Sequence, residues 1–350
     1  MENWKTVRLG DVCEKGSSNI AQNEITDNNG EYPIYGAAGF IKNVDFYKQD
    51  KPYIGIVKDG AGVGRVSVHP AKSSLIGTMQ YIFPKENIDI KFLAEFLKYQ
   101  NLSRFYTGAT IPHIYFKDYQ NIPLKLPSLQ KQKHISAVLD KCTALITKHK
   151  LMLEKYDTLI KSRFIEMFGD PVLNEKGWEL KTLPELGEFG RGVSKHRPRN
   201  APELLGGKYP LIQTGDVANA NLYITDYEST YSEEGFKQSK MWKAGTLCIT
   251  IAATIAKTAI LTFDSCFPDS VVGFTPNEKI NSLFINSWFS FFQKILEEQA
   301  PAVAQKNINL QILSELKIIT PPISLQNDFA AFVQQIDKSK FENNYKELVA

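Results

Sequence analysis

The sequence predicts an α+β protein in which two mixed α/β domains are joined by long helices that form an antiparallel coiled coil. This prediction rests on two observations. One stretch of about 40 residues, within 128–170, contains no Gly or Pro and repeats its apolar residues every seven positions. In addition, a β-rich segment followed by a helical one occurs twice along the chain.

The central helix is predicted over 128–170. It follows Pro127 with Ser128 as a capping residue, and Gly169-Asp170-Pro171 ends it. At 1.5 Å per residue it would be about 60 Å long, which is typical of a coiled coil rather than of an ordinary globular helix. The apolar or semi-apolar heptad positions are Ile135, Cys142, His149 and Tyr156; Val138, Leu145, Met152 and Leu159; and Leu139, Ile146, Leu153 and Ile160.

The internal repeat extends over the whole chain. A constant offset of 194 aligns Pro127 with Pro321 and Gln132 with Gln326. Tyr32-Pro33-Ile34 recurs as Tyr209-Pro210-Leu211, and residues 56–65 match 248–257, both runs ending in a basic residue. Each copy is expected to hold short strands and one amphipathic helix, near 90–105 and 280–298. Because the polar loops differ between the copies, they indicate two surfaces that recognise different things; duplication followed by drift is the alternative.

The composition fits a soluble globular protein of more than one domain. The chain has 350 residues, 43% hydrophobic and 23% charged, with a net charge of only +3. The four cysteines lack metal-ligand spacing, and no signal peptide is evident, so we expect a cytoplasmic location. The apolar segment 246–263 carries Lys257 and several threonines, which favours a buried strand pair over a membrane span.

The sequence lacks the motifs that catalysis on DNA would need. There is no N-P-P-Y or D-P-P-Y for an adenine methyltransferase and no G-x-x-x-x-G-K-[ST] for an ATP-driven motor. The glycine-rich run from Gly60 to Arg65 favours a tight turn between strands over a phosphate cradle. The five histidines are isolated in sequence. We therefore expect no catalytic residue and no metal site.

Four runs resemble one known family. LPSLQKQKHISAVLDKCTALI (126–146) and TPPISLQNDFAAFVQQIDKSKF (320–341) look like the spacer helices of type I restriction–modification specificity (S) subunits. FIEMFGDPVLNEKGWELKTLPELGE (164–188) looks like the first spacer helix leading into the second target-recognition domain. The segment 108–127 resembles the close of such a domain. The similarity covers essentially the whole chain.

The resemblance implies a non-catalytic DNA-recognition subunit. The domains would be a first target-recognition domain (1–127), a central spacer helix (128–170), a second target-recognition domain (171–321) and a short C-terminal spacer helix (322–350). Each recognition domain would read one half of a bipartite site in double-stranded DNA. The helices would dock methyltransferase subunits, and restriction (motor/nuclease) subunits would join them. The chain itself would hold no cofactor, with S-adenosylmethionine, ATP and Mg expected in the partner subunits.

Candidate DNA contacts are basic, amide, hydroxyl and aromatic residues in loops, since such groups bind phosphates and base edges. Solvated surface loops are the alternative for each of them. In the first domain they are Lys15, Ser17, Ser18, Asn19, Lys58, Arg65, Arg104, Tyr106, Thr107 and His113. In the second domain they are Arg191, Ser194, Lys195, His196, Arg197, Arg199, Gln213, Thr214, Gln305, Lys306 and Asn307.

The C-terminal helix is predicted to be too short to cover the whole central helix. If Ile323 lies beside Phe168, equal counting brings Ala350 only to about Lys141. Ile135, Val138 and Leu139 would then face either the first domain or a methyltransferase subunit. Two other functions stay open: a coiled-coil module that binds protein rather than DNA, and a self-contained DNA methyltransferase.

Overall fold

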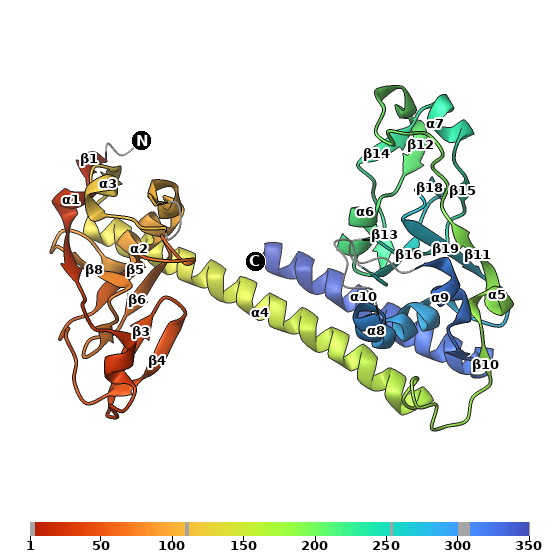
Figure 1. Ribbon diagram of the computed structural model, residues 1–350, viewed down its shortest axis with the longest axis horizontal. Helices are drawn as coiled ribbons and strands as arrows, with labels where there is room; N and C mark the ends of the chain where they lie inside the picture. The colour runs from red at the N-terminus through yellow and green to blue at the C-terminus, as the bar shows by residue number, and fades with distance from the viewer. Residues whose placement is uncertain (1–3, 109–111, 253–254, 300–308, 350) are drawn as a thin grey trace. The chain divides into compact units, whose positions relative to one another are not determined.

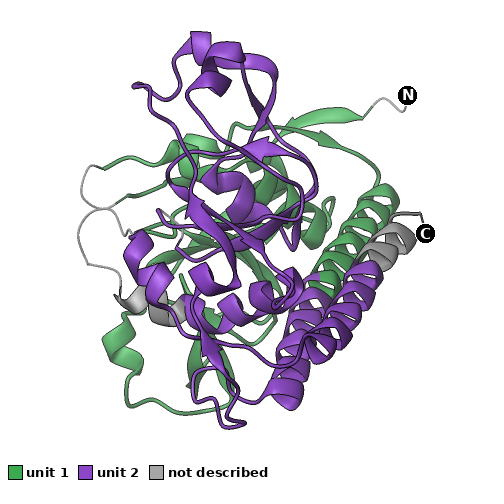
Figure 2. Cartoon of the chain, turned by 90° about the vertical axis from the view of Figure 1, so that its right-hand side faces the viewer, with its two compact units in different colours: residues 1–149 green, residues 150–350 purple. Residues whose placement is uncertain are grey.

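The computed structural model describes residues 4–108, 112–252, 255–299 and 309–349, with the backbone alone for 294–299 and 341–349. The chain forms two compact units, Met1–His149 (unit 1) and Lys150–Ala350 (unit 2), coloured separately in Figure 2. The long helix predicted at 128–170 is present as α4 (Leu129–Phe168), the uninterrupted yellow helix of Figure 1, and it contributes to both units. Mixed strands and helices in both units confirm the α+β class.

Unit 1 is built from short strands and one longer helix besides α4. In chain order its elements are β1 (Lys5–Arg8), α1 (Leu9–Val12), β2 (Cys13–Ser17), the 3-10 turn η1 (Gln22–Ile25), β3 (Tyr32–Gly36), β4 (Gly39–Val44), β5 (Tyr53–Val57), β6 (Val66–His69), β7 (Ser74–Leu75), β8 (Met79–Pro84), α2 (Ile90–Tyr99), η2 (Leu102–Phe105), α3 (Phe116–Tyr119) and β9 (Pro123–Leu126).

The main sheet of unit 1 is antiparallel, in the order β2-β8-β5-β6, and α2 packs on it. The Asp89 carboxylate caps α2 by accepting from the backbone nitrogen of Phe92 at 3.0 Å. The helix ends at Tyr99, because Asn101 takes a left-handed conformation with φ 48°. A second sheet has the order β4-β3-β7, and β1 pairs with β9.

Unit 2 contains the end of α4 and a second set of short strands. Its further elements are β10 (Leu180–Lys181), α5 (Leu183–Leu186), β11 (Gly187–Arg191), η3 (Pro202–Leu204), β12 (Leu205–Leu211), α6 (Thr214–Asn219), β13 (Tyr223–Ile224), β14 (Ser229–Tyr231), α7 (Glu233–Lys237), β15 (Met241–Trp242), β16 (Leu247–Thr250), β17 (Thr258–Leu261), β18 (Ser265–Cys266), β19 (Val271–Pro276), α8 (Ser282–Gln299), α9 (Leu310–Glu315), β20 (Ile318–Ile319) and α10 (Ile323–Val349).

The main sheet of unit 2 has the order β11-β19-β16-β17-β13. The apolar segment 246–263 forms the buried antiparallel pair β16–β17, as predicted. None of the described helices combines the length and the hydropathy that a membrane span needs. A second sheet has the order β14-β12-β18-β15, and β10 pairs with β20.

The two units share one frame, which we define as β2-β8-β5-β6 with α2 in unit 1 and β11-β19-β16-β17 with α8 in unit 2. The four strands follow the same chain order and the same antiparallel pairing. In both units a strand of the second sheet pairs in parallel with a short strand, β3 with β7 and β12 with β18. The frame therefore realises the repeat predicted from the sequence.

Two glutamines, aligned by the repeat, fasten a helix to each frame in the same way. The Gln132 side chain accepts from the Asp89 backbone nitrogen at 2.8 Å and donates to the carbonyls of Asn87 (3.2 Å) and Pro127 (2.9 Å). Gln326 accepts from Asn281 at 2.9 Å and donates to the carbonyls of Lys279 (3.1 Å) and Pro321 (2.7 Å). Both side chains are fully buried. We call these arrangements the glutamine clamps.

Within unit 2 the end of α4 packs antiparallel on α10. Phe329 contacts both Phe164 and Phe168, with ring centroids 5.4 and 5.6 Å apart, and Lys340 pairs with Asp157 at 2.8 Å. The register predicted from equal counting is therefore wrong: Phe329, not Ile323, lies beside Phe168. The first turn of α10 is held by the Gln326 clamp, and Ile323 stays 40% exposed.

Candidate nucleic-acid interface

Several candidate residues of unit 1 meet at one end of its main sheet. The ladder pairs Ser17 with Gln80, Gln80 with Ile56, and Ile56 with Val66. Ser17 at the end of β2, Lys58 just after β5 and Arg65 just before β6 therefore lie at the same sheet end, which we call the loop end. Ser17 is far from Lys58 and Arg65 in sequence, so only the strand order brings it to them.

A carboxylate organises part of the loop end. His113 Nδ1 lies 2.7 Å from Asp59 Oδ1, and Lys58 Nζ lies 3.7 Å from Asp59 Oδ2. The backbone groups of Thr107 and His113 bond to each other at 2.8 and 2.9 Å. Lys58, Thr107 and His113 thus form one polar cluster, in which Asp59 offsets part of the positive charge.

The glycine-rich run is the tight turn between β5 and β6 that the sequence predicts. Gly64 has φ +85°, and a Cβ there would collide with the backbone nitrogen of Ser103, so only Gly allows this approach. The approach brings Arg65 near Ser103 at a shallow pocket of about 470 Å³. In the same segment the Arg104 guanidinium lies 4.8 Å from the Phe105 ring centroid, and the Tyr106 side chain is 56% exposed.

The segment around β2 divides into exposed and buried candidates. Lys15, Ser17 and Asn19 are exposed. Ser18 is buried, and its hydroxyl donates to the Leu75 carbonyl at 2.5 Å and accepts from the Ile20 backbone nitrogen at 3.3 Å. Because both of its hydrogen bonds are internal, the Ser18 side chain has a structural position and does not face a ligand.

The basic loop of unit 2 begins at the equivalent loop end. Arg191 ends β11 and pairs with Val272, and Val272 pairs with Ile249 near the end of β16. The Gln238 side chain holds the loop by accepting from the backbone nitrogens of Lys195 (2.5 Å) and His196 (2.9 Å). Arg191, Lys195 and His196 are exposed.

Two arginines of this loop converge on one carboxylate. Asp269 lies 3.3 Å from Arg197 and 2.5 Å from Arg199, and all three side chains are partly exposed. Arg197 also donates to the Ser194 carbonyl at 2.6 Å. The Ser194 side chain is buried, so it turns inward rather than toward a ligand. Within the described part of the chain, the Arg191 and Lys195 side chains make no hydrogen bond or ion pair.

The weaker candidates of unit 2 fall into two groups. Gln213 is exposed, precedes α6, and donates from Nε2 to the Ser229 hydroxyl at 3.3 Å. Thr214 is half-buried at the start of α6. Gln305, Lys306 and Asn307 lie outside the described residues.

Lys257 is a functional candidate that sequence reasoning missed. The same backbone hydrogen bonds close both loops: Val57 with Gly64 and Arg65 in unit 1, and Thr250 with Ala256 and Lys257 in unit 2. Lys257 is therefore the counterpart of Arg65. The signal in the sequence is that the aligned runs 56–65 and 248–257 both end in a basic residue, whereas the apolar neighbours of Lys257 predict burial.

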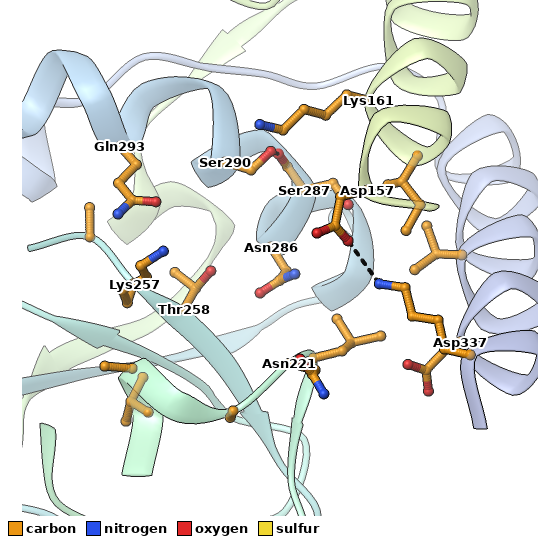
Figure 3. Close-up of a pocket in the computed structure, with 18 residues that line it drawn as sticks. Asp157, Lys161, Asn221, Lys257, Thr258, Asn286, Ser287, Ser290, Gln293 and Asp337 are labelled. Atoms are coloured by element: carbon orange, nitrogen blue, oxygen red, sulfur yellow. Dashed lines mark hydrogen bonds and ion pairs between the residues drawn. The ribbon is translucent and has the colours of Figure 1, made fainter. Parts of the chain in front are cut away.

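Lys257 lines a polar pocket of about 290 Å³ in unit 2. Figure 3 shows Lys161 from α4, Asn286 and Gln293 from α8, and Asp337 from α10 around the same cavity. Asn286 Oδ1 is buried without a partner among the described residues, and burial raises the pKa of Asp337. Because the pocket mixes lysines and carboxylates, it is not a simple phosphate site. No described group of three or more His, Cys, Asp or Glu is placed to hold a metal ion.

The predicted interface residues lie on the unit 1 part of α4. Ile135 is half-buried, whereas Val138 and Leu139 are 45% and 39% exposed. Gln132 and Ser136, which precede Leu139 by two turns and one turn, are buried against unit 1, where the Ser136 hydroxyl lies 3.1 Å from the Asp89 carboxylate. The exposed stripe continues through Leu145 and Ile146.

The family model of the type I restriction modification DNA specificity domain matches residues 1–155 and again 175–349. The chain belongs to this family. It is similar to a putative type I restriction enzyme specificity subunit of Haemophilus influenzae, at 24% identity over 88% of this chain and 80% of the relative. It is likewise similar to the EcoDI specificity subunit of Escherichia coli, at 24% identity over 95% of this chain and 81% of the relative.

Solved structures of the family have the same fold. The S subunit of a type I restriction–modification system from M. genitalium superposes with a TM-score of 0.66 at 16% identity, covering 98% of this chain and 92% of that one. A chain from a study of type I complex assembly gives a TM-score of 0.54 at 14% identity, covering 99% and 93%. The resemblance drawn from the sequence is thus confirmed, and the chain is a type I DNA specificity protein with two copies of the specificity domain.

Proposed function

We propose that unit 1 and unit 2 each read one half of a bipartite DNA site through the loop end of their main sheet. The observation that supports this most directly is the duplicated frame, which carries different polar groups at equivalent loop ends. Unit 1 presents Lys58, Arg65 and His113 there, and unit 2 presents the basic loop from Arg191. Equal frames with unequal loops suit two half-sites of different sequence.

Exchanging one unit tests this proposal. Residues 172–319 are replaced by the corresponding segment of a family member with a different site, and methylated adenines are sequenced in cells that carry the hybrid. One half of the methylated sequence should change and the other half should persist. A change in both halves, or in neither, would contradict independent reading by the two units.

The basic loop of unit 2 is expected to contact DNA phosphates through Arg191 and Lys195, which have no internal partner in the described structure. Arg197 and Arg199, oriented by Asp269, are the better candidates for base contacts, because a fixed guanidinium can pair with guanine.

Replacing Arg191 and Lys195 by Ala should weaken binding to all sequences and lower the salt slope by about two, at roughly 0.9 per phosphate contact. Lys279→Ala is a matched control, because this exposed lysine follows β19 at the other end of the sheet. If the double variant and the control have the same salt slope, the loop does not contact phosphates.

We further infer that the exposed stripe of α4 docks a methyltransferase subunit, since soluble proteins rarely leave a continuous apolar stripe bare. We also infer that restriction subunits join this assembly. S-adenosylmethionine, ATP and Mg would act in those partner subunits. Leu139→Asp should abolish co-purification with the methyltransferase, while Lys133→Asp, an exposed change elsewhere on the helix, should not. A stable Leu139→Asp chain that still co-purifies would contradict docking at this stripe.

The chain itself is proposed to be non-catalytic. Incubation of the homogeneous chain with labelled S-adenosylmethionine and DNA should transfer no methyl group. Methyl transfer that follows the chain through purification would support the self-contained methyltransferase instead. Failure of any duplex to bind at low salt would favour a module that binds only protein.

A further inference from the structure

The segment that follows β3 in unit 1 and β12 in unit 2 starts from equivalent strands of the second sheets. Ile34 pairs with Ser74 in parallel, and Leu211 pairs with Cys266 in parallel. These are equivalent positions of the repeat, because Tyr32-Pro33-Ile34 matches Tyr209-Pro210-Leu211. After these strands the two units differ. In unit 1 the chain continues into the β3–β4 hairpin, and in unit 2 it continues through Gln213 into α6. In Figure 1 the hairpin is the red-orange pair labelled β3 and β4.

The tip of the hairpin lies at the loop end of unit 1. Arg65 donates to the Ala37 carbonyl at 2.9 Å, which joins the tip to the turn between β5 and β6. On the other side, the Ile76 backbone nitrogen donates to Tyr35, and Gly77 donates to Ile20, next to the exposed Asn19. The tip is thus tied to both groups of DNA-contact candidates in this unit.

Phe40 projects from this tip with 62% of its surface exposed. Single exposed apolar side chains are common on proteins, so exposure alone indicates little. Two features distinguish Phe40. The residues before it, Ala37, Ala38 and Gly39, are small, with Gly39 at φ +112° and no atom within 4 Å of where its Cβ would be. Its ring also packs on Tyr35, at 6.1 Å between centroids and 71° between planes, which limits its freedom.

We propose that the β3–β4 hairpin enters the DNA major groove and that Phe40 reads a thymine methyl group there. The major groove admits a two-stranded ribbon, and an apolar side chain such as Phe contacts the methyl group that distinguishes thymine. β4 is an edge strand of its sheet, so one side of the ribbon pairs with no other described strand. The inference rests on the proposed function and names a contact that the sequence did not suggest.

Unit 2 carries a different chemistry at the equivalent position. The exposed Gln213 stands where the hairpin tip begins in unit 1, and an amide can pair with adenine in the major groove. At corresponding places, unit 1 therefore presents an apolar side chain, Phe40, and unit 2 presents a hydrogen-bonding side chain, Gln213. This difference accounts for two half-sites of unequal sequence without a change of fold.

The test uses the full chain and duplexes that contain the site found by sequencing methylated adenines. Each thymine of the half-site is replaced in turn by deoxyuridine, which removes only the methyl group. Affinity should fall by about four-fold at one position, the factor expected from the transfer of one methyl group. Phe40→Ala should bind the unmodified site more weakly and respond to none of the replacements. Tyr47→Ala is the matched control, because this aromatic residue is 40% exposed beyond the other end of β4.

Each alternative result decides the question. If Phe40→Ala keeps the affinity and the deoxyuridine response of the unaltered chain, Phe40 does not read thymine. A uniform loss on every duplex, with no methyl response, would assign Phe40 to stacking or backbone contact and overturn the proposal. The proposal would also be overturned if the half-site read by unit 1 contained no A·T pair. If the unaltered chain prefers no sequence at all, the proposed function fails first, and this inference fails with it.

Discussion

Because of the glutamine clamps, a single Gln→Ala substitution should cause a large and local loss of stability. Gln132→Ala removes one acceptor and two donors that are fully buried. At about 1 kcal/mol for each hydrogen bond, the free energy of unfolding of unit 1 should fall by about 3 kcal/mol. Gln326→Ala should cost a similar amount in unit 2, since its three bonds are equivalent.

Two measurements check this prediction. Urea unfolding gives the change in free energy, and hydrogen–deuterium exchange locates it. The Asp89 amide should exchange faster in Gln132→Ala while the Asn281 amide keeps its rate, because the two amides belong to different clamps. Gln132→Glu keeps the acceptor but turns a carboxylate oxygen toward the carbonyls of Asn87 and Pro127, so it should lose at least as much stability as Gln132→Ala. Gln130→Ala, an exposed change on the same helix, is the control.

The prediction fails if Gln132→Ala loses less than about 1 kcal/mol, which is the value of a single hydrogen bond. It also fails if exchange at Asp89 matches that of the Gln130→Ala control. Either result would mean that water replaces the amide at no cost, and that α4 is held to unit 1 by apolar packing alone.

Four further substitutions have defined outcomes in thermal or urea unfolding. Gly64→Ala should lower the free energy of unfolding by at least about 2 kcal/mol, because of left-handed strain and overlap with Ser103. Ala256→Gly should change it by no more than about 1 kcal/mol, because the relief of left-handed strain offsets the lost burial of the methyl group. Burial lowers the pKa of His69 from 6.5 to about 4, so the unfolded state takes up a proton first as the pH falls. The free energy of unfolding should therefore decrease by up to about 3 kcal/mol between pH 6.5 and pH 4, and this decrease should be smaller in His69→Gln. Ser18→Ala should lose about 1–2 kcal/mol of stability with DNA affinity unchanged, since both its hydrogen bonds are internal.

Regular features of the fold were accessible from sequence alone because they depend on periodic patterns. The heptad pattern predicts a long central helix, and α4 spans Leu129–Phe168. The offset of 194 predicts that Gln132 and Gln326 are equivalent, and their hydrogen bonds are the same. The helix predicted near 90–105 is shorter, since the backbone of Asn101 turns left-handed, which no periodicity signals.

The arrangement of the candidate site depends on strand order, which the sequence does not encode locally. Ser17 reaches the sheet end that holds Lys58 and Arg65 only because β8 pairs with both β2 and β5, and His113 joins Lys58 there through Asp59. The burial of single residues is also not evident from the sequence. Ser18 and Ser194 look like polar loop residues, yet their side chains are buried. The register of α10 was missed because an aromatic cluster around Phe329, rather than the helix start, fixes it.

The position of the hairpin tip also bears on how such a protein acquires a new target. Phe40 and Gln213 are exposed and lie outside the buried cores, whereas the clamps and the frame are internal. Exposed substitutions away from special contacts usually change stability by no more than about 0.5 kcal/mol. Mutations at these two positions can therefore accumulate almost freely as far as folding is concerned. If these two residues read DNA as proposed, selection on them acts on the choice of target, and a lineage can change one half of its site without passing through an unfolded intermediate.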